Sequence, residues 1–346
     1  MRIQADNPLL QYCGRIDFDN PKAPVMVYAC TSVKLAFTGT SVSVTMDNRH
    51  CCYDNYMGYM LDGEMGRFLL ADEPGQKDYK IAGNLKDGQH ELLLYKRQDA
   101  GHYVTLLGFD IDGDIIEPSE RPARRIEVFG DSVSCGEVSE ALDYVGKPDP
   151  VHNGEYSNSY YSYSWMTARK LNAELHDTSQ GGIALLDGTG YFAAPVLAGV
   201  ESCYDKIEYN PHLGETKPWD FSKYTPHVVV VAIGQNDSHP EDYMAEDYDG
   251  TKAARWRAHY ETFIRRLMSL YPQARIILTT TILNHDAAWD KAIDYVCNKI
   301  NNHRVHHFVY KRNGAGTPGH IRIPEAEEMS DELVAYINSL GKEIWN

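Results

Sequence analysis

The alternation of hydrophobic and polar residues changes about one third of the way along the chain. Up to about residue 117, apolar residues alternate with polar ones in short runs, as at Val42, Val44 and Met46, which serine and threonine separate. A period of two predicts half-buried antiparallel strands. Turn residues recur at close spacing, without a convincing helical period. This pattern predicts a β-sandwich or jelly roll over residues 1–117.

After residue 125 the pattern indicates alternating strands and helices. Residues 228–233 are continuously apolar, which is typical of a parallel strand buried on both faces. Alternation of strand and helix predicts an α/β fold with a doubly wound parallel sheet over residues 126–346. Residues 118–125, with two prolines and a charge run, predict the linker. Further strands are expected at 275–281 and 305–310, and helices at 260–271, 289–300 and 324–340.

The charge of the chain excludes two classes of partner. The 346 residues include 33 Lys and Arg against 49 Asp and Glu, which gives a formal net charge of −16. Nucleic acids and anionic membranes both need a basic face. We therefore expect no nucleic acid and no membrane as partner, and a soluble protein with a neutral substrate.

The cysteines and histidines indicate neither a disulfide framework nor a metal site. The 7 cysteines are scattered, without a Cys-x-x-Cys pair, which favours free thiols in a reducing compartment. The first residues lack the apolar core of a signal peptide. We therefore expect a cytoplasmic protein, although a secreted protein that had lost its signal would look the same. His306 and His307 are neighbours in a predicted strand and face opposite sides, so we expect no metal.

A serine follows the first strand of the second half. A short strand whose apolar residues are Ile126, Val128 and Phe129 runs into Gly130-Asp-Ser132, and the glycine permits a tight exit from the strand. Open α/β sheets bind ligands at the carboxyl ends of their strands. A serine there can be a nucleophile if another residue takes its proton. Alone, Gly-Asp-Ser also fits an ordinary surface turn.

Three further features follow strands of the same predicted sheet. Gly181 and Gly182 form a turn with free N–H groups, Asn236 follows the long apolar run, and His320 lies in a loop before the last helix. An asparagine amide can donate to an oxyanion, and a histidine can accept a proton. Each feature also fits a structural role, such as a turn, a helix cap or a surface histidine. Together, in this order and at one sheet edge, they predict a hydrolase site.

In this order the motifs resemble those of the SGNH, or GDSL-like, hydrolase superfamily over residues 125–346. In the first half, Gly14-Arg-Ile-Asp-Phe18, Val33-Lys-Leu-Ala-Phe-Thr-Gly-Thr-Ser41 and Leu61-Asp-Gly63 resemble the jelly-roll domain of carbohydrate esterase family 2. The resemblance thus covers nearly the whole chain. It implies a serine esterase that removes O-acetyl groups from plant cell-wall glycans such as xylan and mannan, or from their oligosaccharides, without metal or cofactor.

The resemblance also implies a role for each motif residue. Ser132 would be the nucleophile and His320 its general base. The oxyanion hole would consist of the Ser132 N–H, the Gly182 N–H and the Asn236 side chain, with Gly181 as the alternative glycine.

Position 317 departs from the superfamily pattern. An aspartate usually stands three residues before the histidine, but this chain has Thr317. A triad needs a group at the second imidazole nitrogen, and some members of family 2 use a main-chain carbonyl there. We therefore expect the Thr317 carbonyl to contact His320 and complete a Ser132–His320 dyad. The rival is a carboxylate from elsewhere, of which Asp237 is the obvious candidate.

The polar stretch at 136–158 is too long for an ordinary connection and is expected to build the substrate site. Its polarity argues against a long acyl chain, and so against a lipase or thioesterase. Tyr156 is expected to serve as a sugar platform, whereas Tyr161 and Trp165 are expected on the buried face of the next helix. Because position 317 lacks the usual acid, the alternative is that the chain binds carbohydrate and has lost catalysis.

Overall fold

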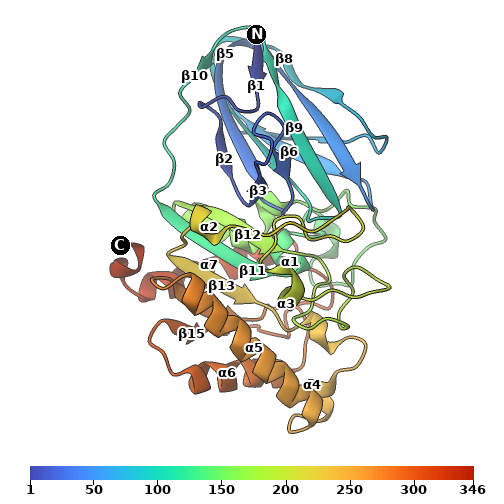
Figure 1. Ribbon diagram of the computed structural model, residues 1–346, viewed down its shortest axis with the longest axis vertical. Helices are drawn as coiled ribbons and strands as arrows, with labels where there is room; N and C mark the ends of the chain where they lie inside the picture. The colour runs from blue at the N-terminus through green and yellow to red at the C-terminus, as the bar shows by residue number, and fades with distance from the viewer.

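The computed structural model describes residues 1–346 and shows an antiparallel β-domain seated on an α/β domain (Figure 1). In the first domain, β5 (Ser32–His50) and β8 (Lys77–Lys96) are the long central strands of a hydrogen-bonded network of ten. The ladder between them shifts register after Gly39, whose φ is 120°. The remaining strands are β1 (Arg2–Gln4), β2 (Gln11–Cys13), β3 (Ile16–Asp17), β4 (Val25–Met26), β6 (Tyr56–Leu61), β7 (Glu64–Leu69), β9 (His102–Ile111) and β10 (Ile115–Ile116).

The alternating apolar residues of these strands face inward. Val42, Val44 and Met46 are buried in one cluster with Leu92 and Phe109 of the neighbouring strands. Ser41 and Ser43, which flank Val42, remain partly exposed, whereas Thr45, between Val44 and Met46, is also buried. The period of two therefore identified the apolar residues that face the core of this domain. The predicted antiparallel β-domain is confirmed.

The second domain contains a five-stranded parallel sheet in the order β12-β11-β13-β14-β15. Helices cover both of its faces, so the predicted doubly wound fold is also confirmed. The strands are β11 (Arg124–Gly130), β12 (Ala173–Ser179), β13 (Val228–Ala232), β14 (Arg275–Thr279) and β15 (Val305–His307). The helices are α1 (Ser132–Cys135), α2 (Tyr163–Lys170), α3 (Val200–Cys203), α4 (Tyr243–Glu246), α5 (Thr251–Leu270), α6 (Ala287–Ile300) and α7 (Ile323–Ser339).

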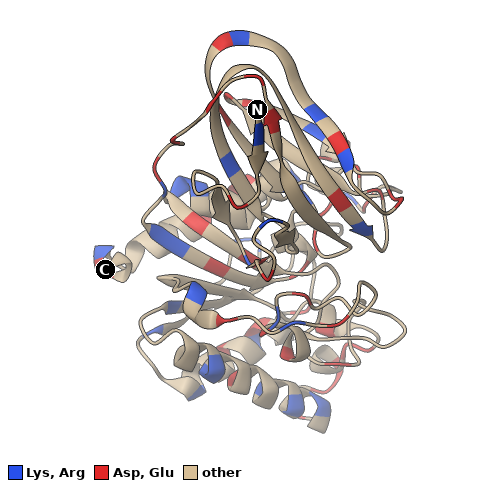
Figure 2. Ribbon diagram, turned by 45° about the horizontal axis from the view of Figure 1, so that its top comes forward, with Lys and Arg blue, Asp and Glu red and all other residues tan.

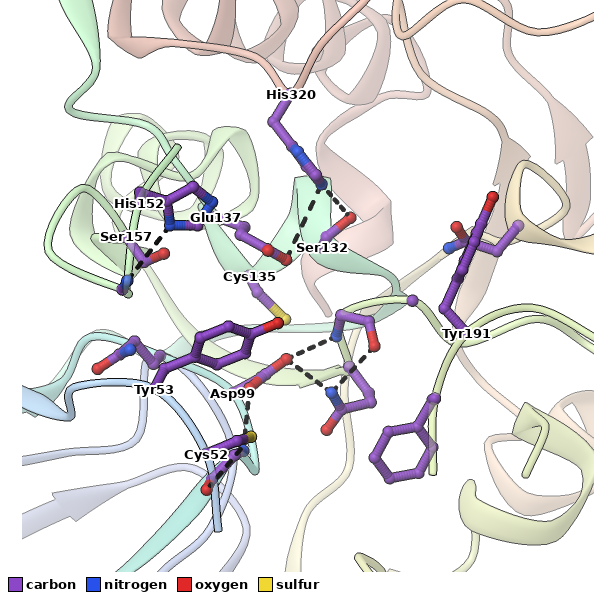
Figure 3. Close-up of a pocket in the computed structure, with 18 of the residues that line it drawn as sticks. Cys52, Tyr53, Asp99, Ser132, Cys135, Glu137, His152, Ser157, Tyr191 and His320 are labelled. Atoms are coloured by element: carbon purple, nitrogen blue, oxygen red, sulfur yellow. Dashed lines mark hydrogen bonds and ion pairs between the residues drawn. The ribbon is translucent and has the colours of Figure 1, made fainter. Parts of the chain in front are cut away.

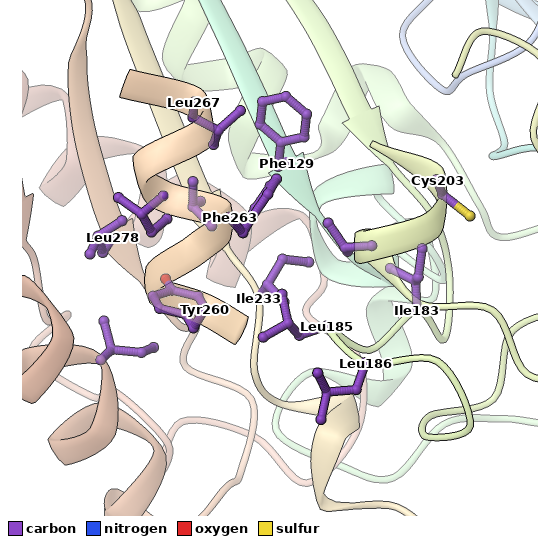
Figure 4. Packing of buried hydrophobic residues seen from close by; sticks show 14 of the residues in the cluster. Phe129, Ile183, Leu185, Leu186, Cys203, Ile233, Tyr260, Phe263, Leu267 and Leu278 are labelled. Atoms are coloured by element: carbon purple, nitrogen blue, oxygen red, sulfur yellow. The ribbon is translucent and has the colours of Figure 1, made fainter. Parts of the chain in front are cut away.

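Residues of β13 alternate between two buried clusters. Val229 packs in the cluster that contains α5 and α6, whereas Val230 packs in the cluster that contains α2 and α7. On the first face, the ring of Phe263 from α5 lies 5.7 Å from that of Phe129 on β11 (Figure 4). Because apolar helices cover both faces, the strand needs no polar positions.

Several element boundaries differ from those expected from the sequence. Helix α5 begins at Thr251, before the expected residue 260, and strand β14 ends at Thr279 instead of 281. Strand β11 begins at Arg124, inside the stretch that we interpreted as linker. Strand β15 ends at His307. The Phe308 N–H still donates to the Leu278 carbonyl oxygen of β14 at 2.9 Å, and the chain then leads toward the loop that carries His320.

The surface of the molecule carries acidic and basic residues on both domains (Figure 2). The negative excess is therefore not confined to one segment. Helix α5 is locally basic, because Glu261 is its single acidic residue. No helix combines the length and the apolarity that crossing a bilayer requires.

A buried ion pair joins the two domains. Arg15, between β2 and β3, places Nη2 2.9 Å from Oε1 of Glu127 on β11, and their side chains are 1% and 0% exposed. Arg15 Nη1 also donates to the Tyr204 carbonyl oxygen at 2.6 Å. Thr178 donates to the same oxygen of Glu127 at 2.9 Å. These bonds compensate charges that would otherwise be costly to bury.

Replacing Arg15 with alanine should lower the free energy of unfolding by about 3–5 kcal/mol, because Glu127 would stay buried without its cation. Denaturant unfolding followed by circular dichroism measures this loss. The control is Arg121→Ala, which breaks the pair with Glu174 and removes a side chain that is 43% exposed. It should cost less than about 1 kcal/mol. Equally small losses in the two variants would contradict a stabilising role for Arg15.

Candidate active site

Ser132 begins α1 directly after the turn that leaves β11. A Cβ on Gly130 would lie 2.1 Å from the Ser134 hydroxyl oxygen, so only glycine fits the turn. Asp131 caps the helix by accepting a hydrogen bond from the Val133 N–H at 3.0 Å. Ser132 is 5% exposed and lines a cavity of about 930 Å³. As the first residue of the helix, it has an N–H without an intrahelical partner.

His320 connects the serine to a carboxylate. Its Nε2 lies 2.8 Å from Ser132 Oγ, and its Nδ1 lies 2.6 Å from Asp149 Oδ2. The other carboxylate oxygen of Asp149 accepts bonds from the His320 N–H at 2.9 Å and from Arg322 Nη2 at 2.8 Å. Asp149 is thus fixed by three donors. The three side chains Ser132, His320 and Asp149 form one hydrogen-bonded chain.

The third group of this chain differs from both candidates that the sequence suggested. The Thr317 carbonyl accepts a bond from the Asn284 N–H at 2.9 Å, and Asp149 occupies the His320 nitrogen that we expected Thr317 to contact. Asp237 is buried and accepts bonds from the N–H groups of Leu185 and Leu186 instead. The expectation of a carbonyl-supported dyad is therefore wrong. Asp149 was missed because it lies in an irregular loop that offers no periodicity or motif.

The glycine turn after β12 presents one free N–H group to the cavity wall. The Gly181 N–H donates to Asp99 Oδ2 at 2.8 Å, and Gln180 Nε2 donates to the same oxygen at 2.6 Å. Gly182, with φ 71°, has no acceptor for its N–H in the protein. Of the two glycines that the sequence left open, Gly182 is therefore the one available to a ligand. Asp99, which holds the turn, comes from the first domain.

Asn236 lines the same cavity. Its Nδ2 lies 3.0 Å from the Ile183 carbonyl oxygen and 3.3 Å from Asp131 Oδ2. The second contact is long for a hydrogen bond, so a developing oxyanion can replace it at small cost. Asn236, Gly182 and the Ser132 N–H thus lie around one cavity, as the sequence predicted, together with His320.

Charge sets the protonation of the two groups beside the serine. Burial alone would lower the pKa of His320, but the nearby carboxylates of Glu137 and Asp149 outweigh it and raise that pKa to about 9. Burial would likewise raise the pKa of Asp149, yet its bond to His320 and the charge of Arg322 lower it to about 2. Asp149 is therefore ionised at neutral pH, and it stabilises the imidazolium that forms when His320 takes a proton.

Both domains line the cavity (Figure 3). Tyr53 from the first domain and Tyr191 from the second are 53% and 57% exposed and lie on its wall. Tyr191 stacks on His239 with ring centroids 4.1 Å apart. Tyr156, which we expected as the sugar platform, is not among the residues that line the cavity. Tyr53 was missed because nothing in the first half of the sequence shows which of its turns meets the other domain.

The chain is similar in sequence and in structure to known carbohydrate esterases. Residues 12–118 match the carbohydrate esterase 2 N-terminal family model. The chain is 30% identical to the cellulase/esterase CelE of Acetivibrio thermocellus over 97% of its own length, but it spans only 40% of that protein. It is 26% identical to an acetylxylan esterase / glucomannan deacetylase of Cellvibrio japonicus, with 98% of this chain and 90% of the relative covered. A family two carbohydrate esterase from Clostridium thermocellum, solved in complex with cellohexaose, superposes with a TM-score of 0.80 at 28% identity, over 97% of this chain and 100% of the other.

A fluorophosphonate reagent, which modifies activated serines, should label Ser132, and the labelling rate should rise with pH. Only a neutral imidazole can take the serine proton, so the midpoint of the rise should lie near the His320 pKa of about 9. Mass spectrometry of the labelled peptide, with rates measured from pH 6 to 10.5, tests this.

In Asp149→Asn the pH midpoint of the labelling rate should fall, because a negative charge beside His320 is lost. The plateau rate should also fall by about 100-fold or more, because the imidazole loses its orienting acceptor. Asp143→Asn removes an exposed carboxylate from the same loop and should change neither quantity. A rate independent of pH, or an unchanged plateau in Asp149→Asn, would contradict the assignment.

Proposed function

Because the chain belongs to carbohydrate esterase family 2, we propose that it is a serine esterase that removes O-acetyl groups from plant cell-wall glycans, or from their oligosaccharides, of the xylan or mannan type. The observation that carries the proposal is the unbroken hydrogen-bonded chain of Ser132, His320 and Asp149 in a cavity between two domains. A serine, a base and an orienting acid in this geometry support nucleophilic attack on an ester.

The first half of the reaction forms an acetyl-enzyme. Ser132 Oγ attacks the acetyl carbonyl carbon while His320 Nε2 takes the serine proton. The Ser132 N–H, the Gly182 N–H and the Asn236 amide hold the negative charge that develops on the carbonyl oxygen. When the tetrahedral intermediate collapses, its bond to the sugar oxygen breaks and His320 returns the proton to that oxygen. The deacetylated sugar then leaves.

The second half regenerates the serine. His320 takes a proton from a water molecule, whose oxygen attacks the acetyl carbon and forms a second tetrahedral intermediate held by the same donors. The bond to Ser132 Oγ breaks, the proton passes from His320 to that oxygen, and acetate is released. Asp149 stays ionised throughout and holds the imidazole in one orientation.

The composition of the cavity supports a small acyl group and a polar leaving group. Exposed aromatic faces such as those of Tyr53 and Tyr191 suit the flat apolar face of a sugar ring. Two relatives support this substrate class: one bears the name acetylxylan esterase / glucomannan deacetylase, and another was solved with cellohexaose. A long acyl chain would need an apolar channel, whereas Asp99, Glu137 and Asp149 line this cavity. A lipase or thioesterase is therefore the weaker alternative.

The test is release of acetate from acetylated xylo- and manno-oligosaccharides by the wild type and by Ser132→Ala. The wild type should release acetate, and the substitution should lower kcat by about 1,000-fold or more, because the acyl-enzyme cannot form. The ratio of the wild-type rates then identifies the preferred glycan. Binding of both oligosaccharides without acetate release would contradict the proposal and favour a carbohydrate-binding protein.

A further inference from the structure

Glu137 carries a carboxylate that the protein leaves without a hydrogen-bond donor. Its backbone is fixed just beyond α1, because its N–H donates to the Ser132 carbonyl oxygen at 3.0 Å. The carboxylate lines the cavity, and its Oε2 lies 3.9 Å from His320 Nε2 (Figure 3). That separation is an ion-pair distance and too long for a hydrogen bond. The side chain thus reaches the reacting centre but has no hydrogen-bonding task in the protein.

The other carboxylates around the nucleophile are fully engaged. Asp131 accepts bonds from Val133 and Gln235, and Asp149 holds His320 and Arg322. Asp99 likewise binds the N–H of Gly181. Each of these carboxylates has a structural explanation. An ionised carboxylate can accept about four hydrogen bonds, so an empty one facing a cavity is a ready site for a donor.

The position of Glu137 relative to His320 identifies the part of the substrate that it meets. The departing oxygen must come within about 3 Å of Nε2 to receive the proton. Because Oε2 of Glu137 lies 3.9 Å from the same nitrogen, the sugar that owns the departing oxygen is next to this carboxylate. Sugars present hydroxyl groups around the ring, and each is a hydrogen-bond donor. The acetyl group, which has no donor, cannot satisfy Glu137.

The surroundings of Glu137 favour a neutral donor from the substrate. A Cβ on Gly181 would lie 2.9 Å from Glu137 Oε2, so the carboxylate borders the glycine turn on its other side. No lysine or arginine lines the cavity. Besides His320, three histidines line the cavity, namely His50, His152 and His212, but only His320 lies within ion-pair distance of Glu137. An anionic sugar placed there would be repelled.

We propose that Glu137 is a specificity-determining residue, which accepts a hydrogen bond from a hydroxyl of the acetylated sugar while His320 protonates the departing oxygen of that sugar. The inference rests on the proposed function and adds to it the group that recognises the leaving alcohol. A bond to an ionised acceptor is stronger than one between neutral groups, so it gives glycosyl esters an advantage over esters whose alcohol lacks hydroxyls.

The experiment compares two acetyl esters in wild type, Glu137→Gln and Glu137→Ala. One ester is an acetylated xylo- or manno-oligosaccharide, as identified above, and the other is 4-nitrophenyl acetate, whose leaving group has no hydroxyl donor. Removing the charge of Glu137 also alters the pKa of His320, so kcat/KM is compared on the high-pH plateau of each enzyme. For the sugar ester it should fall about 10- to 100-fold, and more in the alanine variant. For the aryl ester it should change less than about threefold.

Asp143→Asn is the matched control, because it removes one exposed carboxylate from the same loop outside the cavity, and it should leave both rates unchanged. Equal losses on both esters, or no loss on either, would overturn the proposal. The proposed function fails separately, if the wild type releases no acetate from any acetylated sugar. A wild type active on sugars, together with an unchanged ratio of the two rates in Glu137→Gln, overturns only the inference about Glu137.

Discussion

The docking of the end of β8 against the second domain is the contact on which the rest of the site depends. Arg97 is buried there and donates to Glu140 Oε2 at 2.6 Å and to the Ser157 carbonyl oxygen at 3.0 Å, so it holds both ends of the loop that carries Asp149. Asp99 holds the glycine turn in the same way. The β-domain therefore positions the groups on both sides of the nucleophile.

The same docking explains why charged side chains, whose burial costs free energy, lie between the domains. Lys96 is fully buried and donates to the carbonyl oxygens of Gln98 and Asp99, and burial lowers its pKa to about 7. On the other side of the junction, Arg15 and Glu127 are paired out of contact with water. Removing one partner of such a pair costs more than the intact pair contributes. The interface is thus specific for one relative placement of the domains.

The sequence predicted the parts of the structure that depend on local pattern. The period of two predicted the antiparallel strands of the first domain, and the continuous apolar runs predicted the parallel strands of the second. Burial on one face produces the first pattern, and burial on both faces produces the second. Ser132, Gly182, Asn236 and His320 could be placed together because each follows a strand, and parallel strands end at the same edge of a sheet. The geometry brings these four around one cavity.

The parts that the sequence did not predict all depend on docking between segments with no shared pattern. Asp149 lies in an irregular loop, and its approach to His320 depends on Arg97 of the other domain. The Thr317 carbonyl was expected from a resemblance, but it is used by the Asn284 N–H. Proximity in sequence to the polar loop suggested Tyr156 as a sugar platform. Its carbonyl oxygen accepts a bond from the Glu140 N–H within the loop, and other exposed tyrosine rings line the cavity.

Asp99 of the β-domain holds the glycine turn of the other domain, and this turn carries the Gly182 N–H that we propose as an oxyanion donor. The role of Asp99 can be measured in Asp99→Ala, from kcat and KM for acetate release together with the melting temperature. We expect kcat to fall about 100-fold, with KM changed less than about threefold and the melting temperature within a few degrees, because Gly182 loses its fixed direction while the fold persists. An unchanged kcat in a folded variant would show that Asp99 does not position Gly182 and that the β-domain only lines the cavity.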